Sequence, residues 1–204
     1  MNSSAVKIFK DNMWTNNPVF IQVLGICSTL AVTNNLTNTL IMSLGLIFVT
    51  AFSNFTLSTL KSLIPDKVRM IIQTLVIAFY VIIVDIILRA YLPEISKSLG
   101  PYVGLIITNC IIMGRAEAFA RSNPPMISFW DGITSGIGYM WVLMVIAAIR
   151  ELAGFGTIFG FTVMPEAFTK WTIMVMPPSA FFLLGALVWV SKSLILKKEK
   201  NNGA

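Results

Sequence analysis

An uncharged run from Asn12 to Leu60 is the feature that most constrains this chain. The run contains 49 residues without Asp, Glu, Lys or Arg, and as one helix it would measure roughly 74 Å at 1.5 Å per residue. The hydrocarbon core of a bilayer is only about 30 Å thick. The run therefore predicts a segment that crosses a membrane, turns and crosses it again.

The composition agrees with a membrane location. Hydrophobic residues make up 56% of the 204 residues and charged residues only 12%, whereas an average soluble domain is about 25% charged. The formal net charge is +6, but the basic residues stand in short clusters between apolar segments and at the two ends, which is typical of topology signals. We therefore expect one integral membrane domain, residues 1–204, that contacts the lipid bilayer and binds no nucleic acid.

Six apolar segments are expected to form transmembrane helices, so the predicted fold class is an all-α membrane protein. Polar turn residues at 33–38, 64–67 and 122–125 separate several of them. The predicted segments are 19–32, 39–60, 70–92, 99–114, 132–149 and 171–191.

The lysines and arginines are distributed unequally between the two sides that six crossings would create. Eleven fall on the side of both chain ends and four on the other, and positive residues favour the cytoplasmic side. Both termini are therefore predicted to be cytoplasmic. The first group is Lys7, Lys10, Lys61, Lys67, Arg69, Arg115, Arg121, Lys192, Lys197, Lys198 and Lys200, and the second is Arg89, Lys97, Arg150 and Lys170.

The segments 19–32 and 99–114 are too short to span a bilayer core. Each offers about 14 to 16 strongly apolar residues, at most about 24 Å of helix. They are predicted to be half-spans or broken helices, and each is the first of a group of three. Three crossings per group make the second group inverted, which predicts two repeats, at about 15–93 and 98–192. Interrupted segments at matching positions of two repeats indicate a site near the membrane midplane.

The two cysteines of the chain, Cys27 and Cys110, each fall in one of these short segments. They could be buried apolar side chains, a disulfide, or metal ligands. A [2Fe-2S] cluster takes four thiolates, whereas this chain has two cysteines and no histidine. If the pair binds iron, a partner subunit has to bring the remaining ligands.

Several stretches resemble one family of membrane proteins. They are 24–28 (LGICS), 30–33 (LAVT), 53–55 (SNF) and, above all, 103–120 (VGLIITNCIIMGRAEAFA). The family contains the D subunits of sodium-translocating NADH:quinone reductases and the E subunits of Rnf ferredoxin:NAD reductases. The resemblance runs from 16–18 to 178–182, nearly the whole chain, and the residues at 95–97 and 178–182 favour the quinone reductase.

The resemblance implies a membrane subunit that contains no complete active site and no catalytic residue of its own. It implies a homologous, inverted partner that supplies two further cysteines, so that Cys27 and Cys110 are cofactor and metal ligands of a shared intramembrane [2Fe-2S] cluster. Electrons would pass singly between flavins and iron-sulfur centres on other subunits of a six-subunit complex in the bacterial inner membrane. Their passage would be coupled to transport of Na⁺, or of H⁺ as in some relatives.

Each charged residue near or within the apolar segments has a structural and a functional interpretation. Asp85 is an intramembrane carboxylate of the kind that marks ion paths, but Arg89 at i+4 favours an intrahelical ion pair. Arg115 and Glu117 follow Cys110. A cation there could stabilise a reduced cluster, or could form an interfacial salt bridge.

Small and polar residues also have two interpretations. Ser28, Thr29, Thr108 and Asn109 flank the cysteines and could donate hydrogen bonds to cluster sulfurs or join membrane helices. Gly132 and Gly136 have the GxxxG spacing that predicts close helix packing.

Three alternatives to the quinone reductase stay open from the sequence. The first is an Rnf-type subunit. The second is a secondary transporter whose cysteines only pack, and the third is a structural anchor for redox subunits.

Overall fold

The computed structural model describes residues 24–91, 93–154, 156–158, 161–162 and 176–202. Helices dominate these ranges, as the sequence predicts. They are α2 (Ile26–Val32), α3 (Leu36–Leu60), the 3-10 turn η2 (Asp66–Val68), α4 (Arg69–Tyr91), α5 (Pro93–Ile107), α6 (Cys110–Arg115), the π-helical segment η3 (Ala116–Ala120), α7 (Pro125–Gly154) and α8 (Pro177–Asn202). A small antiparallel ribbon of β1 (Thr157–Ile158) and β2 (Phe161–Thr162) follows α7.

Four helical stretches are long and apolar enough to cross a membrane, at Leu36–Leu60, Asp66–Tyr91, Tyr102–Ala120 and Pro125–Gly154. They match the predicted segments 39–60, 70–92, 99–114 and 132–149. The apolar part of α8, Pro178–Ser193, is shorter and overlaps the predicted segment 171–191. Residues 19–23 and 171–175 of the predicted segments lie outside the described residues. Apart from the two-residue strands β1 and β2, the regular structure of the described residues is helical, and the chain is a multi-pass membrane protein.

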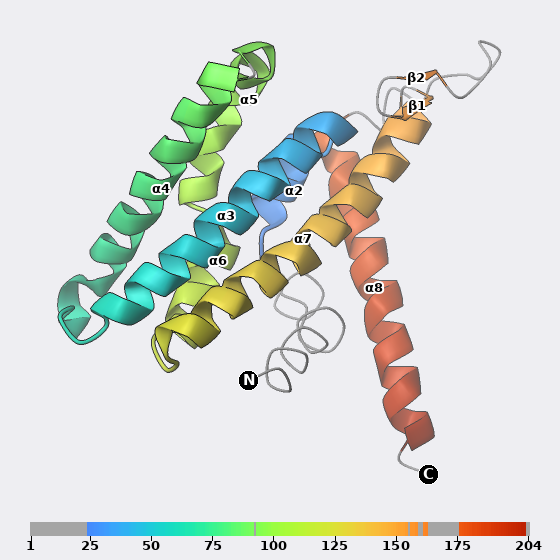
Figure 1. Ribbon diagram of the computed structural model, residues 1–204. Helices are drawn as coiled ribbons and strands as arrows, with labels where there is room; N and C mark the ends of the chain where they lie inside the picture. The colour runs from blue at the N-terminus through green and yellow to red at the C-terminus, as the bar shows by residue number, and fades with distance from the viewer. Residues whose placement is uncertain (1–23, 92, 155, 159–160, 163–175, 203–204) are drawn as a thin grey trace.

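Helix α3 packs antiparallel against α7 at the centre of the molecule (Figure 1). Two glycines allow this close approach. A Cβ atom on Gly132 would stand 2.8 Å from the Ala51 Cα, and one on Gly136 would stand 2.7 Å from the Ile47 Cγ1. Both distances are too short for a real side chain, so the GxxxG prediction of close packing is confirmed.

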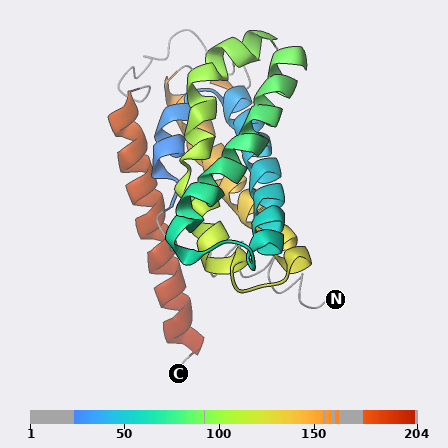
Figure 2. The ribbon, with the colours of Figure 1, turned by 90° about the vertical axis from the view of Figure 1, so that its left-hand side faces the viewer.

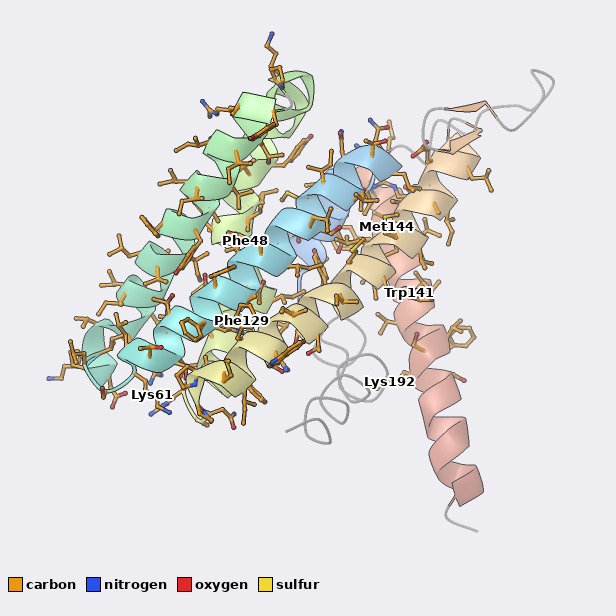
Figure 3. All side chains as sticks on the ribbon, viewed as in Figure 1. Phe48, Lys61, Phe129, Trp141, Met144 and Lys192 are labelled. Carbon is orange, nitrogen blue, oxygen red and sulfur yellow. The ribbon has the colours of Figure 1, made fainter. Side chains whose placement is uncertain are left out.

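The edge of the α3–α7 contact is aromatic. The Phe129 ring meets the Phe52 and Phe55 rings edge-on, with centroids 5.6 and 6.2 Å apart, and Phe129 lies beside α3 in Figure 3. Edge-to-face contacts at these separations are favourable beyond the apolar area that they bury. They add favourable aromatic packing between α7 and α3.

Hydrogen bonds tie α3 to the turn before α7 at one end of the pair and to α7 itself at the other. At one end, the Ser58 hydroxyl donates to the Asn123 carbonyl over 2.7 Å. At the other, the Leu36 amide donates to a Glu151 carboxylate oxygen over 2.6 Å, which places an anion at the N-terminus of α3. Each end of the helix pair is therefore tied by a bond between residues remote along the chain.

Three boundaries differ from the sequence-based predictions. The sequence predicts a turn that includes residues 36–38, whereas these residues form the first turn of α3. Helix α5 begins at Pro93, six residues before the predicted start, because proline suits the first helical position and polar residues can continue a helix outside the apolar zone. Helix α7 extends to Pro125 and Gly154, since several polar residues near those ends are buried and bonded.

Candidate functional site

The predicted segment 99–114 is interrupted at its centre. Helix α5 ends at Ile107 and α6 begins at Cys110, with Thr108 and Asn109 between them. The short α2, seven residues long, begins at Ile26 after Gly25, which has a left-handed φ of 84°. The predicted interruption of the second short segment is confirmed, and the first contains a short helix that starts abruptly at a glycine.

The two cysteines occupy the same place relative to these interruptions. Cys27 is the second residue of α2 and Cys110 is the first residue of α6. Both thiols are free and exposed at the surface of this chain. Within this chain, therefore, neither thiol is buried and the two form no disulfide with each other.

The start of α2 contacts the interruption between α5 and α6. The Asn109 side-chain amide donates to the Ser28 hydroxyl over 3.1 Å, and these residues are the chain neighbours of Cys110 and Cys27. Helices α2 and α5 lie side by side in Figures 1 and 2. The sequence separation between the bonded residues is 81, so the contact joins two regions that are remote along the chain.

Gly25 is required at this contact for two reasons. Its positive φ is costly for any residue with a Cβ atom, and a Cβ there would lie 2.8 Å from the Ile111 Cδ1 and 2.9 Å from the Tyr139 Cε2. On the other side, a Cβ on Gly114 would lie 3.0 Å from the Leu24 Cδ1. Glycines thus let each interruption approach the side chains of the other.

Tyr139 of α7 holds the first interruption in place. Its side chain is fully buried, and its hydroxyl is hydrogen-bonded to Ser28 and donates to the Gly25 carbonyl over 3.2 Å. The Thr29 hydroxyl donates to the same carbonyl over 2.9 Å. The sequence analysis missed Tyr139, although a tyrosine inside an apolar helix signals a hydroxyl that needs a buried partner.

Asn109 holds the second interruption. Its side-chain oxygen accepts from the Ile111 amide over 3.1 Å and caps α6, while its nitrogen bonds Ser28. The sequence predicts that Ser28, Thr29 and Asn109 donate hydrogen bonds to cluster sulfurs. In the structure, the side chains of all three make hydrogen bonds within the protein. Their helix-joining interpretation is confirmed for Ser28 and Asn109, whereas the Thr29 hydroxyl bonds the carbonyl of Gly25 four residues before it. Thr108, the fourth of these residues, is exposed.

The charged residues after Cys110 form ion pairs. The Arg115 Nε donates to an Asp131 oxygen over 3.0 Å, and both residues are buried. Glu117 accepts from Arg69 and, over 3.0 Å, from the Gln73 amide. The salt-bridge interpretation of Arg115 and Glu117 is confirmed.

The intrahelical pair predicted in α4 is also present. The Arg89 Nε lies 2.9 Å from an Asp85 oxygen. Arg150, which the charge count places on the side opposite the termini, is buried and donates to the Thr33 hydroxyl over 2.6 Å. The positive charge of Arg150 therefore lies inside the protein.

The fold and the site together define a class: a multi-pass helical membrane protein in which the start of the short helix α2 touches the interruption between α5 and α6, with one exposed cysteine on each side of the contact. The chain belongs to the family described as Rnf-Nqr subunit, membrane protein, whose profile matches residues 5–188.

Curated relatives are similar over most of this length. A protein of Pseudoalteromonas atlantica is 53% identical over 184 residues, 88% of each chain. One of Chlamydia abortus is 47% identical over 209 residues, 98% of each chain, and one of Psychromonas ingrahamii is 49% identical over 185 residues, 88% of each chain. The name of all three is that of the D subunit of a Na(+)-translocating NADH-quinone reductase.

Proposed function

We propose that this chain is the D-type membrane subunit of a Na⁺-translocating NADH:quinone reductase. We propose further that Cys27 and Cys110 supply two of the four thiolates of a [2Fe-2S] cluster shared with a homologous, inverted subunit. The observation that carries this proposal is the Asn109–Ser28 hydrogen bond, because it ties together the two backbone interruptions that present the thiols.

The donor set fits half of such a cluster. Both thiols are free and exposed on this chain, as ligands to a group at a subunit interface have to be. Among the described residues, no group of three or more His, Cys, Asp or Glu side chains could hold a metal. Because a [2Fe-2S] centre takes four protein ligands, the missing two are assigned to the partner.

The chain directions support two inverted repeats at about 15–93 and 98–192, with six crossings. Helices α3 and α7 run antiparallel, and α4 and α8 lie outside this pair and also run in opposite directions (Figure 1). The bonds Ser58–Asn123 and Leu36–Glu151 are those expected when the two repeats stabilise each other. An inverted partner with the same arrangement would bring two more interruptions to the same level.

The distribution of cations supports the proposed orientation in the inner membrane with cytoplasmic termini. Lys61 and Lys192 lie toward the same end of the molecule (Figure 3), and the end of α3 meets the η3–α7 connection there through Ser58 and Asn123. Arg89 lies at the opposite end of α4. This polarity agrees with the positive-inside rule.

The residues of this chain position the ligands and keep water away. When bound, the cluster accepts and releases one electron at a time. Ser28, Asn109 and Tyr139 fix the spacing of the two ligand-bearing turns. The fully buried side chains of Ile111 and Ile112 supply apolar packing next to Cys110. Sodium transport would be coupled to electron passage through other subunits as well, because this chain alone lacks a complete redox path.

A second candidate function is secondary transport, which the pair of contacting interruptions favours, since discontinuous helices commonly bind ions or solutes. That function needs no exposed thiols. It predicts uptake of a substrate by the chain in vesicles that contain no redox partner. Uptake that persists in a cysteine-free variant would favour transport over the cluster.

The test of the cluster is substitution of its ligands in the purified complex. Cys27→Ala and Cys110→Ala should each remove the iron bound at this site and its paramagnetic resonance signal, and should stop quinone reduction by NADH. Gly104→Ala is the control, because Gly104 lies on the helix before Cys110 and a Cβ there meets nothing within 4 Å. Variants that assemble and keep both the iron and the signal would contradict the assignment.

A further inference from the structure

A cavity of about 320 Å³ lies between the α3–α4 connection and η3. It opens at the end of the molecule where Lys61 lies (Figure 3). Leu57, Ile64 and Ala116 form apolar walls. Ligand pockets in proteins begin at roughly 300 Å³, so the cavity is large enough for a small polar group.

The charged residues around the cavity leave an excess of one positive charge. Lys61, Arg69 and Arg121 line it, together with Asp66. Glu117 joins the cluster through its contacts with Arg69 and Arg121. Three cations and two carboxylates sum to a net charge of +1, which one negative charge on a ligand would neutralise. A phosphodiester carries that single charge.

Two buried polar atoms, each on a residue that lines the cavity, have no partner within the described part of the chain. They are the Arg69 Nε, a donor, and the Gln73 Oε1, an acceptor. Gln73 is only 3% exposed, and its amide nitrogen is already engaged with Glu117 over 3.0 Å. Buried polar groups are normally hydrogen-bonded. An oxyanion would satisfy the Arg69 Nε, and a hydroxyl or another donor would satisfy the Gln73 Oε1.

The other two cations retain donors for the same ligand. The Lys61 Nζ has three protons and contacts the Asn123 carbonyl over 3.2 Å. Arg121 approaches Glu117 at 3.4 Å and Asp66 at 3.7 Å, both longer than a good charge-assisted hydrogen bond. A phosphate oxygen in the cavity would offer each of them a shorter contact.

We propose that this cavity binds the head group of an anionic glycerophospholipid that carries both a phosphodiester and a hydroxyl group, as phosphatidylglycerol does. The phosphodiester would accept from Arg69, Lys61 and Arg121, and the head-group hydroxyl would donate to Gln73. The outer face of α4 begins next to Arg69 with Met70, Ile71 and Leu75, which are 63 to 71% exposed. That face gives the acyl chains an apolar surface, and basic pockets between membrane helices bind such head groups.

The test measures lipid binding to the delipidated complex by native mass spectrometry. The double variant Lys61→Gln/Arg121→Gln should bind phosphatidylglycerol about tenfold more weakly than the unmodified complex, the effect of losing at least one charge-assisted hydrogen bond. Lys67→Gln is the matched control, because Lys67 is an exposed cation of the same connection outside the cavity lining. Equal binding by the double variant and the control would overturn the proposal.

A second comparison tests the hydroxyl and needs no charge substitution. The unmodified complex should prefer phosphatidylglycerol to phosphatidylmethanol, a phosphodiester without a head-group hydroxyl, and Gln73→Leu should abolish that preference. Absence of the preference in the unmodified complex would overturn the proposal even if the double variant failed to assemble. Displacement of the lipid by millimolar inorganic phosphate alone would overturn it as well, because it would assign the cavity to a soluble anion.

Discussion

At the scale of single residues, the site depends on side chains that hold the backbone around each cysteine. The Ser28 hydroxyl bonds Asn109 and Tyr139, and Gly25 accepts from Thr29 and Tyr139. Cys27 and Cys110 stay free because their neighbours, and not the thiols, make the internal contacts. The position of each thiol is therefore set by residues other than the two proposed cluster ligands.

Gly25→Ala should destabilise the protein by about 2–4 kcal/mol, since it combines a left-handed φ with overpacking. The new Cβ would clash with Ile111 and Tyr139. Thermal unfolding of the purified complex measures the loss. Gly104→Ala is the control, because a Cβ at Gly104 meets nothing within 4 Å. It should leave stability unchanged or slightly increased, and an equal loss in both variants would contradict the explanation.

Tyr139→Phe should cost about 1–2 kcal/mol, because it removes a buried hydroxyl that bonds Gly25 and Ser28. Hydrogen exchange of the α2 amides should become faster, and iron should be lost more readily to a chelator. Tyr80→Phe removes a hydroxyl that bonds Thr56 over 2.7 Å at a less buried position and serves as the control. If a chelator removed iron from the Tyr139→Phe variant at an unchanged rate, Tyr139 would not position the ligands.

At the scale of secondary-structure elements, the α3–α7 pair is the scaffold on which the interrupted segments rest. Its closeness depends on Gly132 and Gly136, which oppose Ala51 and Ile47. Helix α7 also provides Tyr139 to the first interruption and Asp131 to Arg115 of α6. A change in the crossing angle of α3 and α7 would therefore shift the segments that contain both cysteines.

Gly132→Ala should weaken the α3–α7 contact strongly, because the added Cβ would stand 2.8 Å from a backbone atom that cannot rotate away. We expect a loss of at least about 2 kcal/mol, measured as the unfolding temperature and the yield of assembled complex. Gly185→Ala in α8, where a Cβ meets open space, should be tolerated. Normal assembly of Gly132→Ala would show that the helices can separate at little cost.

Asp131→Asn should destabilise the α6–α7 connection by about 3–5 kcal/mol, because it removes the negative charge from the buried Arg115–Asp131 ion pair. Asp85→Asn breaks a pair whose arginine side chain is 69% exposed and should cost less than about 1 kcal/mol. Chemical denaturation of the two variants in detergent measures the difference. Similar costs for both would contradict the burial of the Arg115–Asp131 pair.

Local patterns in the sequence predict a half-span or an interruption within the segment 99–114, the close packing at Gly132 and the Asp85–Arg89 pair. Each of these depends on residue spacing within one segment. The contact between Ser28 and Asn109 could not be predicted, since it joins residues 81 apart and no local period encodes it. The role of Tyr139 was hidden for another reason: in a helix that is apolar on all sides, periodicity does not reveal which face is buried.

At the scale of the whole molecule, this chain contributes half of the proposed site. Its described residues provide two contacting interruptions and two exposed thiols, and its family consists of membrane subunits. The bonds at the two ends of the α3–α7 pair join two helices that run in opposite directions. A partner of the same design would complete the thiolate set at the interface.

An iron-specific map of the intact complex tests the central claim most directly. Anomalous scattering collected at the iron edge, or a cryo-electron microscopy map of equivalent quality, would locate any iron relative to the two sulfur atoms. We expect one iron centre within bonding distance of the Cys27 and Cys110 Sγ atoms and of two thiols from another subunit. Thiols that face lipid, with no iron near either of them, would contradict the account.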